Sequence, residues 1–506
     1  MPGSRRLANT WPPTSAALLF SAVAAVAFVL VSPDVGDLWA ARARASAAND
    51  GVGLHYWFSW FAGTVPGHYS ILAPFLSRFI DVGVLGAVAT VAIVPLVRLT
   101  TRGCPHPALA TWLAAFGSAV SLWSGRVPFA EGIALALLAL LCVRGNRALV
   151  AAPAAAVAAL VSPVVAVFLM LGLAGVFVHD RCRRVAAAVT GAAAGVCLLA
   201  IAVLFGTPGP EGFPVAQAVG ATAAFAVLLL ARPSAEVRTV LIASMIACPL
   251  LAIVPNGLGS NFERFAWLCM PVATAATARA GRLLVVLPTV AAMSLTLVQS
   301  TKDLRVASQP MSAAAYYRGL TTQLDRTPGL ANYRVEVVPD GTHVAAYALL
   351  GHAALADGYE TQSTHKLNGI LGSHRLNATS YRRWLSGVAV RYIALDRTTL
   401  TSGPEDRLVR TATPSYLHQV WSDHNWRLYE VDAARPIVPA PAQIVHAGQS
   451  KLVIATPRAA TVGLRVRWSA YLRVRGPTGS TARLRPDGHG FTVMAMSGPG
   501  RFVVSG

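Results

Sequence analysis

The sequence predicts a polytopic α-helical membrane protein with about eleven spans, its N-terminus inside and its C-terminus outside, that ends in an exported α/β domain and a small C-terminal β-sandwich. Three observations predict this fold class. Of the 506 residues, 54% are hydrophobic and only 13% are charged, which is about half the charged fraction of an average soluble domain. Apolar runs suited to membrane helices recur from Ser15 to about Val298 and then stop. Basic residues fall in short clusters between these runs, as topology determinants do.

The apolar runs define the predicted spans. The first run follows Arg5 and Arg6 and has no small-x-small cleavage site behind it, so we interpret it as an uncleaved first helix and not as a signal peptide. Several runs are short for a bilayer, which predicts that some helices are tilted or re-entrant. The predicted spans cover residues 15–32, 81–98, 108–124, 130–143, 148–161, 164–178, 185–205, 215–231, 238–254, 264–278 and 283–299.

Arginines mark alternate loops between these spans. The other short loops, near residues 124–130, 205–214 and 255–263, contain only Arg126, and Arg264 begins the next span. Because positive residues stay in the cytoplasm, the N-terminus is predicted inside, and an odd number of spans places everything after residue 300 outside the plasma membrane. The arginines of the predicted cytoplasmic side are Arg5, Arg6, Arg98, Arg102, Arg144, Arg147, Arg181, Arg183, Arg184, Arg232, Arg238, Arg279 and Arg282.

The predicted domains are a transmembrane domain over residues 1–300, with a long first outer loop at 33–80, an exported α/β domain over 301–435, and an exported β-rich module over 436–506. "YRVEVVPDGTH" predicts a strand and a turn, "HVAAYALLGHAALA" a helix, and "SYRRWLSGVAVRYIALD" a helix, a glycine break and a buried strand. "YLHQVW" and "WRLYEVD" predict a hairpin, and the alternating short segments after "ARPIVPAPAQ" predict the sandwich.

Composition excludes several function classes. The net charge of +20 comes from topology clusters and the tail, and no long basic run is interleaved with aromatics, so no nucleic-acid partner is expected. The six cysteines lie in or between spans without a CxxC pair, which argues against a zinc site or a disulfide framework. No GxGxxG, Walker or GxSxG motif is present, so no cytoplasmic nucleotide donor is indicated. The tail carries 24 basic against 13 acidic residues, which favours docking to an anionic lipid surface or an acidic polymer.

Two acidic residues, Asp34 and Asp37, follow directly after the first predicted span, in "PDVGDLWAARARAS". The functional interpretation makes Asp37 or Asp34 a general base that deprotonates a sugar hydroxyl, kept ionised by the nearby Arg42 or Arg44. The alternative is a helix-capping or juxtamembrane acid that keeps the loop solvated. Both interpretations stay open from the sequence.

The rest of the first outer loop is rich in aromatic and histidine residues. Trp57 and Trp60 are candidate platforms for the apolar faces of sugars, and His55 and His68 are candidates to orient a phosphate. An interfacial aromatic belt is the alternative. In the tail, "GYETQSTHKLNGIL" is dense in hydrogen-bonding groups and is the segment there most suited to closing over a site, with a polar surface loop as the alternative. Its candidate residues are Tyr359, Glu360, Gln362, His365 and Asn368.

Arg126 in "SGRVPFAEG" and Arg264 in "SNFERFAWL" are charges at an apolar boundary, where ionisable residues usually face the bundle interior or a watery cavity. An arginine fork suits a phosphate. We therefore assign both arginines, together with Glu263, to binding the phosphate of a lipid. The alternative is a structural lock, in which Arg264 pairs with Glu263 or Glu131 or extends its guanidinium to the membrane surface (snorkels).

In its layout the chain resembles the GT-C superfamily of integral membrane glycosyltransferases, which use polyprenyl-phosphate sugars. The shared layout is a cytoplasmic N-terminus, a long first outer loop with acids near its start, many spans and an exported C-terminal domain. More narrowly, "GRVPFAEGIAL", "LVSPVVAVFL", "LFGTPGPEGFP", "GSNFERF" and "WLSGVAVRYIALD" resemble a group of actinobacterial membrane proteins that brings no assigned chemistry. GT-C membership implies an inverting transfer, with Asp37 or Asp34 as the first-loop catalytic acid. The Asp-Val-Gly-Asp spacing departs from the acid-x-acid metal motif of some members.

The expected function is therefore transfer of a sugar from a polyprenyl-phosphate donor to a hydroxyl of a cell-envelope glycan or glycolipid, at the extracytoplasmic face. The expected partners are that donor, that acceptor and membrane lipid. No cofactor is expected, and a divalent metal is not supported by the residues. Two alternatives remain: a transporter or flippase for a lipid or glycan, for which no internal repeat is found, and a non-catalytic envelope assembly protein.

Overall fold

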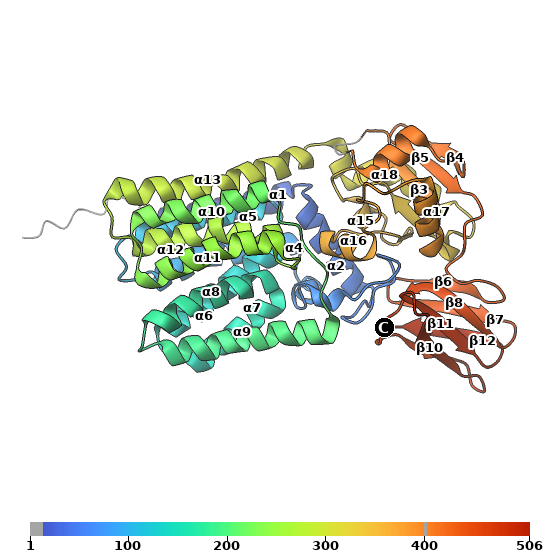
Figure 1. The fold of residues 1–506 in the computed structure, drawn as a ribbon, viewed down its shortest axis with the longest axis horizontal. Helices are drawn as coiled ribbons and strands as arrows, with labels where there is room; N and C mark the ends of the chain where they lie inside the picture. Colours follow the sequence, from blue (N-terminus) through green and yellow to red (C-terminus); the bar gives the residue numbers. More distant parts are fainter. Residues whose placement is uncertain (1–13, 399–401) are drawn as a thin grey trace, which may run out of the picture. The chain divides into compact units, whose positions relative to one another are not determined.

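A computed structural model describes residues 14–398 and 402–506, which fold into two compact units (Figure 1). Arg5 and Arg6, which the topology prediction uses, lie outside the described residues. We call the first unit the helical unit; its described residues are 14–33, Gly83–Ala200 and Gly212–Lys302. We call the second the loop–tail unit; it contains Asp34–Val82, Ile201–Glu211 and Asp303–Gly506.

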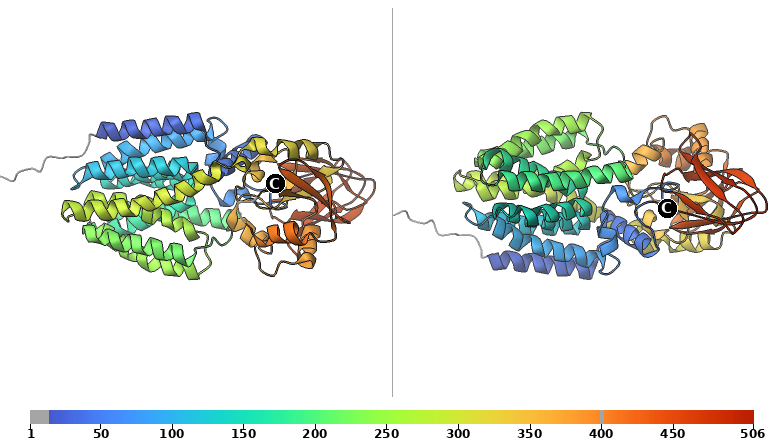
Figure 2. Two further views of the ribbon diagram at one scale, coloured as in Figure 1. Left: turned by 90° about the horizontal axis from the view of Figure 1, so that it is seen from above. Right: turned by 90° about the horizontal axis from the view of Figure 1, so that it is seen from below.

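The helical unit is a bundle of apolar helices that lie side by side (Figure 2). A helical element covers each of the eleven predicted segments, although the count of eleven crossings stays a prediction. Among the described residues, six helices are long and apolar enough to cross a membrane: α1 (Thr14–Val31), α4 (Val82–Thr100), α6 (Val127–Arg144), α9 (Arg184–Phe205), α11 (Ala235–Ile253) and α13 (Arg282–Ala307). The shorter elements are α5 (Pro107–Trp123), α7 (Ala148–Val161), α8 (Pro163–His179), α10 (Val215–Leu228) with η2 (Leu229–Ala231), and α12 (Met270–Thr277), which follows the π-helical turn η4 (Phe265–Cys269).

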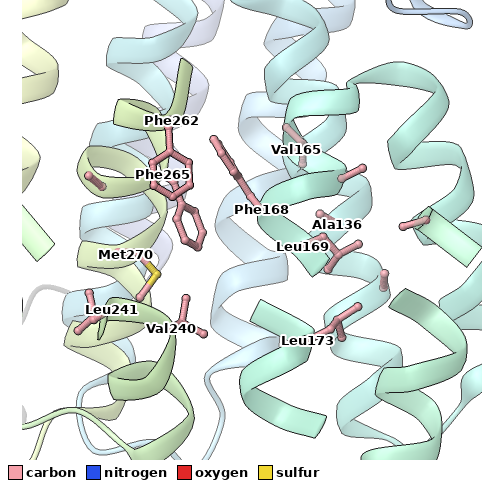
Figure 3. Close-up of a cluster of buried hydrophobic side chains, with 14 of the residues drawn as sticks. Ala136, Val165, Phe168, Leu169, Leu173, Val240, Leu241, Phe262, Phe265 and Met270 are labelled. Carbon is pink, nitrogen blue, oxygen red and sulfur yellow. The ribbon is translucent and has the colours of Figure 1, made fainter. Parts of the chain in front are cut away.

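Small and aromatic side chains build the core of the helical unit (Figure 3). Buried alanines such as Ala155 have small side chains, so the helices that carry them can approach their neighbours closely. Phe168 on α8 stacks on Phe265 with ring centroids 4.8 Å apart. Gly175 on α8 faces the backbone of α11, and a Cβ there would come within 2.7 Å of the Glu236 carbonyl oxygen. The contact between α8 and α11 therefore requires glycine.

The first outer loop belongs to the loop–tail unit and begins with a helix that the sequence reasoning did not predict. This helix, α2 (Gly36–Asn49), has the alanine-rich sequence "GDLWAARARASAAN", which strongly favours helix. Trp39, Ala43 and Ala47 are buried on one side of α2. The short η1 (Pro66–His68) and α3 (Ala73–Leu76) follow α2 along the chain.

The middle of the loop–tail unit is a five-stranded mixed sheet in the order β2-β1-β3-β5-β4. The predicted helix–glycine–strand segment and the predicted hairpin are both confirmed. The predicted helix over "HVAAYALLGHAALA" is wrong: only α15 (Ala345–Ala348) forms, because the chain turns at Gly351 (φ 84°) and pairs β2 in parallel with β1. The strands are β1 (Arg334–Val337), β2 (Ala354–Leu355), β3 (Val390–Asp396), β4 (Leu417–Ser422) and β5 (Trp426–Val431). The helical elements are η5 (Pro310–Ser312), η6 (Ala314–Tyr317), α14 (Arg318–Asp325), η7 (Leu330–Asn332), α16 (Thr361–Leu367), α17 (Ala378–Gly387), α18 (Pro404–Arg407) and the π-helical turn η8 (Leu408–Ala412).

The last part of the chain is a β-sandwich, as the alternating pattern predicts (Figure 1). One sheet has the order β10-β11-β8 and the other the order β6-β7-β12-β9. Inward side chains of both sheets, including Met494 and Phe502, share one hydrophobic cluster. The strands are β6 (Gln443–Ala447), β7 (Lys451–Thr456), β8 (Ala460–Arg467), β9 (Arg473–Arg475), β10 (Ala482–Pro486), β11 (Phe491–Met496) and β12 (Gly500–Ser505).

The first outer loop is part of the core of the tail. Trp57 and Trp60 lie in the same buried cluster as Trp426 of β5. The backbone of the loop also bonds the tail, because Leu355 N donates to Ser59 O at 2.7 Å. Chain segments that share one core must lie on one side of a membrane. The loop, residues 201–211 and the tail therefore share a side, as the loop pattern predicts, while the identity of that side stays a prediction.

Candidate functional site

The helical unit contains a polar pocket of about 110 Å³, which we call the arginine pocket. Its walls come from the N-terminal ends of α6 and α10, from η3 (Gly259–Phe262) and the turn that follows it, and from α13. Polar side chains line it although the surrounding helices are apolar. The lining residues that matter for the argument are Arg126, Gln217, Glu263, Arg264, Leu268 and Gln299.

The charges of the arginine pocket are buried. Arg126 is 8% exposed and Glu263 is 5% exposed, and burial of this kind in a membrane helix bundle is costly unless the groups face a pocket or a partner. Three cations act electrostatically on the Glu263 carboxylate, which are Arg264, Arg126 and Lys302 in decreasing order. The Glu263 carboxylate therefore lies within electrostatic reach of both arginines. Positive charge exceeds negative charge here, which favours an anionic ligand.

A larger cavity of about 300 Å³, which we call the apolar cavity, lies among α4, α5, α6, α8, α11 and α12. Leu268 lines both this cavity and the arginine pocket. Phe129 lines the cavity as well, and its ring centroid lies 5.5 Å from the Arg264 guanidinium. The lining continues to Thr101, just past the end of α4, so the apolar cavity runs along the bundle. A polar and an apolar chamber that share a wall suit a ligand with an anionic head and an apolar chain.

Asp34 and Asp37 lie in the loop–tail unit at the start of α2. The N-cap residue is Val35 and no side chain caps the helix, so the helix-capping alternative is wrong. Asp37 lies in the first turn of α2, where the helix dipole favours a carboxylate. Its Oδ1 accepts a hydrogen bond of 2.7 Å from the Tyr359 hydroxyl. Burial raises the pKa of the Asp34 carboxyl, and the charge of Arg42 partly offsets that increase.

Two helical turns after Asp37, α2 presents a buried ion-pair cluster. Arg44 pairs with Glu360, and His68 Nε2 lies 2.9 Å from the other oxygen of the same carboxylate. The side chains are only 9%, 11% and 6% exposed in that order. Burial alone would raise the pKa of Glu360, but Arg44 and His68 more than offset this and hold it well below its ordinary value. Tyr359 and Glu360 therefore bind α2 at two positions that lie two helical turns apart.

The structure corrects the roles expected for the aromatic residues of the first loop. Trp57 and Trp60 are each 1% exposed, and their rings pack on one another with centroids 4.1 Å apart. Neither indole offers a face to a sugar, because both are core side chains. His68 is bound to Glu360, and its burial does not suit a phosphate ligand. His55 is exposed and stacks on Tyr471 of the tail at 4.6 Å.

Sequence reasoning missed several residues of the arginine pocket. Gln217 and Gln299 are amides within otherwise apolar spans, and this polar interruption is the signal that would have found them. Gln217 Oε1 and Trp267 Nε1 are buried and have no hydrogen-bond partner within residues 14–398 and 402–506. These polar atoms would gain from a bound polar ligand.

The structure groups the predicted site residues in two sets. Arg126, Glu263 and Arg264 meet in the arginine pocket of the helical unit. Asp37 of the loop–tail unit meets Tyr359, with Asp34 three residues before it in the chain. Within the part of the chain that the structure describes, no three His, Cys, Asp or Glu side chains are arranged to hold a metal ion. Metal independence itself stays a prediction.

Comparison with known proteins gives a weak structural likeness. No protein-family model matches the sequence, and no curated protein matches it. Among solved structures, the chain is similar to the arabinofuranosyltransferase AftD from Mycobacteria, with a TM-score of 0.43 and 14% sequence identity over 85% of this chain. The matched part is 41% of the length of that structure's chain, so the present chain spans less than half of it.

Proposed function

We propose that the chain is a membrane glycosyltransferase of GT-C type, which moves a sugar from a polyprenyl-phosphate donor to a hydroxyl of a cell-envelope acceptor at the extracytoplasmic face. One observation carries the proposal: two arginines, Arg126 and Arg264, line a polar pocket that shares the Leu268 wall with a long apolar cavity. A lipid phosphate has the matching shape and polarity.

The arginine pocket supports the binding of the leaving group. A guanidinium presents paired N–H donors that fit two phosphate oxygens, and such charge-assisted bonds are strong where water is excluded. When the bond from the anomeric carbon to the phosphate oxygen breaks, negative charge grows on that oxygen. Arg126 and Arg264 would stabilise this charge in the transition state.

The apolar cavity supports a lipid donor over a soluble one. Its volume of about 300 Å³ is enough for several isoprene units of a polyprenyl chain. Burial of that hydrocarbon contributes about 25 cal/mol per Å² of apolar surface. A polyprenyl chain in the bilayer is already out of water, so moving it into the cavity brings little further hydrophobic free energy. The cavity would therefore select the chain by shape more than by hydrophobicity.

An acid of the first loop would complete the reaction. The acceptor oxygen attacks the anomeric carbon as its proton moves to the carboxylate, and the polyprenyl phosphate departs from the opposite face, which inverts the anomeric centre. Asp37 is suited to this role because the hydrogen bond from the Tyr359 hydroxyl orients its carboxylate. Asp34 is the second candidate, since the raised pKa of its carboxyl makes it the stronger base.

The test measures sugar transfer in membranes supplied with polyprenyl phosphates that carry labelled arabinose or mannose. Asp37→Asn or Asp34→Asn should lower the rate at least about 100-fold if that residue is the base, and Asp325→Asn, an exposed acid of the same unit, should leave it unchanged. Full activity in both variants would exclude acid-dependent transfer by either residue. Binding of polyprenyl phosphate alone should weaken about tenfold or more in Arg126→Gln and Arg264→Gln, and not in the exposed Arg147→Gln control.

A second candidate, a lipid transporter, is favoured by the length of the apolar cavity, which runs from Phe129 to Thr101 along the bundle. A transporter would move fluorescent polyprenyl phosphate between leaflets of reconstituted vesicles without an acceptor and without either acid. Lipid movement that persists in the Asp34→Asn/Asp37→Asn double variant, with no sugar transfer by the wild type, would favour this candidate over the glycosyltransferase.

A further inference from the structure

The outer face of one sheet of the C-terminal sandwich carries a group of cations. In the sheet β6-β7-β12-β9, Leu452, Ile454 and Phe502 point into the core, so their neighbours along the strands point outward. The register places Lys451, Ser505 and Arg473 in one row across three strands. Arg475 lies in the next row opposite Val503, and Arg501 lies beside Ala455. We call Lys451, Arg473, Arg475 and Arg501 the basic sheet face.

The neighbouring edge strand of the other sheet carries two further cations. Strands β9 and β10 lie next to each other at the edges of the two sheets. Arg483 and Arg485 of β10 alternate with the inward Leu484, and both are exposed. Two more guanidiniums are thereby added to those of β9.

Among the described residues, these cations have no acidic partner. Residues 436–506 contain nine basic residues and a single acid, Asp487, which accepts hydrogen bonds from the backbone of its own turn. Within the described residues, no ion pair forms at the basic sheet face or at Arg483 and Arg485. The register sets none of these cations directly opposite another, so the face gathers unpaired positive charge that an anionic partner would neutralise.

The chemistry of the face selects among anionic partners. Adjacent strands lie about 4.8 Å apart and alternate residues of one strand about 6.8 Å apart, so the four cations of the basic sheet face form an array suited to regularly spaced charges. Arginine forks bind carboxylate and phosphate oxygens in pairs. The only large hydrophobic side chain of the described sandwich that is exposed is Val445, on the far edge strand β6. Docking on a membrane gains from apolar side chains that enter the interface, and the valines of this face, Val453 and Val503, are only partly exposed.

We propose that the basic sheet face, with Arg483 and Arg485, binds an acidic glycan: a linear polysaccharide that carries carboxylate or phosphodiester groups along its length. The inference does not depend on the proposed sugar transfer. It would hold the chain on a charged polymer of the cell envelope whether that polymer is acceptor, product or scaffold.

The experiment uses the full chain in nanodiscs of neutral lipid, with polygalacturonate as the probe and uncharged dextran as the control polymer. Binding to polygalacturonate should weaken as the salt concentration rises, and dextran should not bind. The triple variant Arg473→Gln/Arg475→Gln/Arg501→Gln should bind at least about tenfold more weakly. The matched triple variant Arg326→Gln/Arg375→Gln/Arg383→Gln removes the same charge from exposed positions outside the sandwich and should change the affinity less than about twofold.

Three results would overturn the inference. Equal losses in the two triple variants would mean that net charge alone drives binding. Binding to vesicles of anionic phosphatidylglycerol but not to polygalacturonate would identify a membrane surface as the partner. No binding of the wild type to polygalacturonate or to a glycerol-phosphate polymer at low salt would exclude an acidic glycan. Equal melting temperatures of the variants and the wild type establish that an affinity loss comes from the face and not from unfolding.

Discussion

The hydroxyl of Tyr359 donates a hydrogen bond of 2.7 Å to Asp37 Oδ1, across 322 residues of sequence. The acid comes from the first outer loop and the tyrosine from the tail. Next to them, Gly36 leaves room for the ring, since a Cβ at that position would lie 3.1 Å from the Tyr359 oxygen. The tail therefore fixes the orientation of the carboxylate that we propose as the base.

Tyr359→Phe removes this hydrogen bond and keeps the ring. We expect the rate of sugar transfer to fall about tenfold, because a hydrogen bond to a charged group is worth about 1.5–3 kcal/mol. The affinity for polyprenyl phosphate should not change, since Tyr359 lies in the loop–tail unit and not at the arginine pocket. Tyr333→Phe is the control, and wild-type rates in Tyr359→Phe would argue against Asp37 as the base.

Glu360→Gln breaks the buried ion pair and leaves Arg44 without a counter-charge. We expect the free energy of unfolding of the loop–tail unit to fall by about 3 kcal/mol. The folded pKa of Glu360 lies below the unfolded value of about 4.5, so its contribution is present above pH 4.5 and is lost as the pH falls. Denaturation followed by tryptophan fluorescence between pH 3 and 7 should show that the free energy of unfolding decreases less on acidification in the variant than in the wild type.

Glu405 and Glu336 should make the free energy of unfolding depend on pH in the direction opposite to that of Glu360. Both are buried, and Glu405 Oε1 accepts a hydrogen bond of 2.7 Å from Tyr381. Burial raises the pKa of Glu405 to about 8, and burial together with the nearby Glu405 raises the pKa of Glu336 well above its ordinary value. Above the unfolded pKa of about 4.5, the folded state then binds more protons than the unfolded state. The free energy of unfolding therefore falls as the pH rises from 4.5 to 8.

Glu405→Gln therefore should stabilise the chain at pH 8 by about 1–3 kcal/mol and flatten this slope. The melting temperature measured from pH 5 to 9 gives the comparison, with the exposed Asp325→Asn as the control. A variant slope as steep as that of the wild type would mean that Glu405 is ionised in the folded state.

Trp57→Ala tests the corrected role of the first-loop aromatics. A core tryptophan should cost about 3–5 kcal/mol of stability when truncated. His55→Ala, two residues earlier and exposed, should cost little. Chemical denaturation measures both. A Trp57→Ala variant that unfolds like the wild type but binds acceptor more weakly would restore the sugar-platform interpretation.

The sequence allowed a good prediction of the helical segments, because apolar runs of this length have few alternatives to a membrane helix. Strand β3 and the hairpin β4–β5 were also predictable, since their patterns are local. The helix α2 was missed although "AARARASAA" favours helix, because the aromatic residues after it suggested an interfacial loop. The alternation of apolar and polar residues and the aromatic content of a loop do not reveal which hydrophobic core the loop joins.

The candidate site was predictable only in its charges. Arg126 and Arg264 stand out in an apolar sequence, and the structure brings them to one pocket with Glu263. Their neighbours Gln217 and Gln299 come from helices far along the chain. The partnership of Asp37 with Tyr359 depends on tertiary contacts that no local pattern encodes.

The contact between Trp60 and the tail can form only late in the synthesis of the chain. The indole nitrogen of Trp60 bonds the carbonyl of Ala346, which the ribosome adds 286 residues later. At about 5–20 residues per second, this interval lasts about 15–60 seconds. Through that interval Trp57 and Trp60 lack the tail side chains that share their core, so the first loop can complete its fold only after residue 346 has been made.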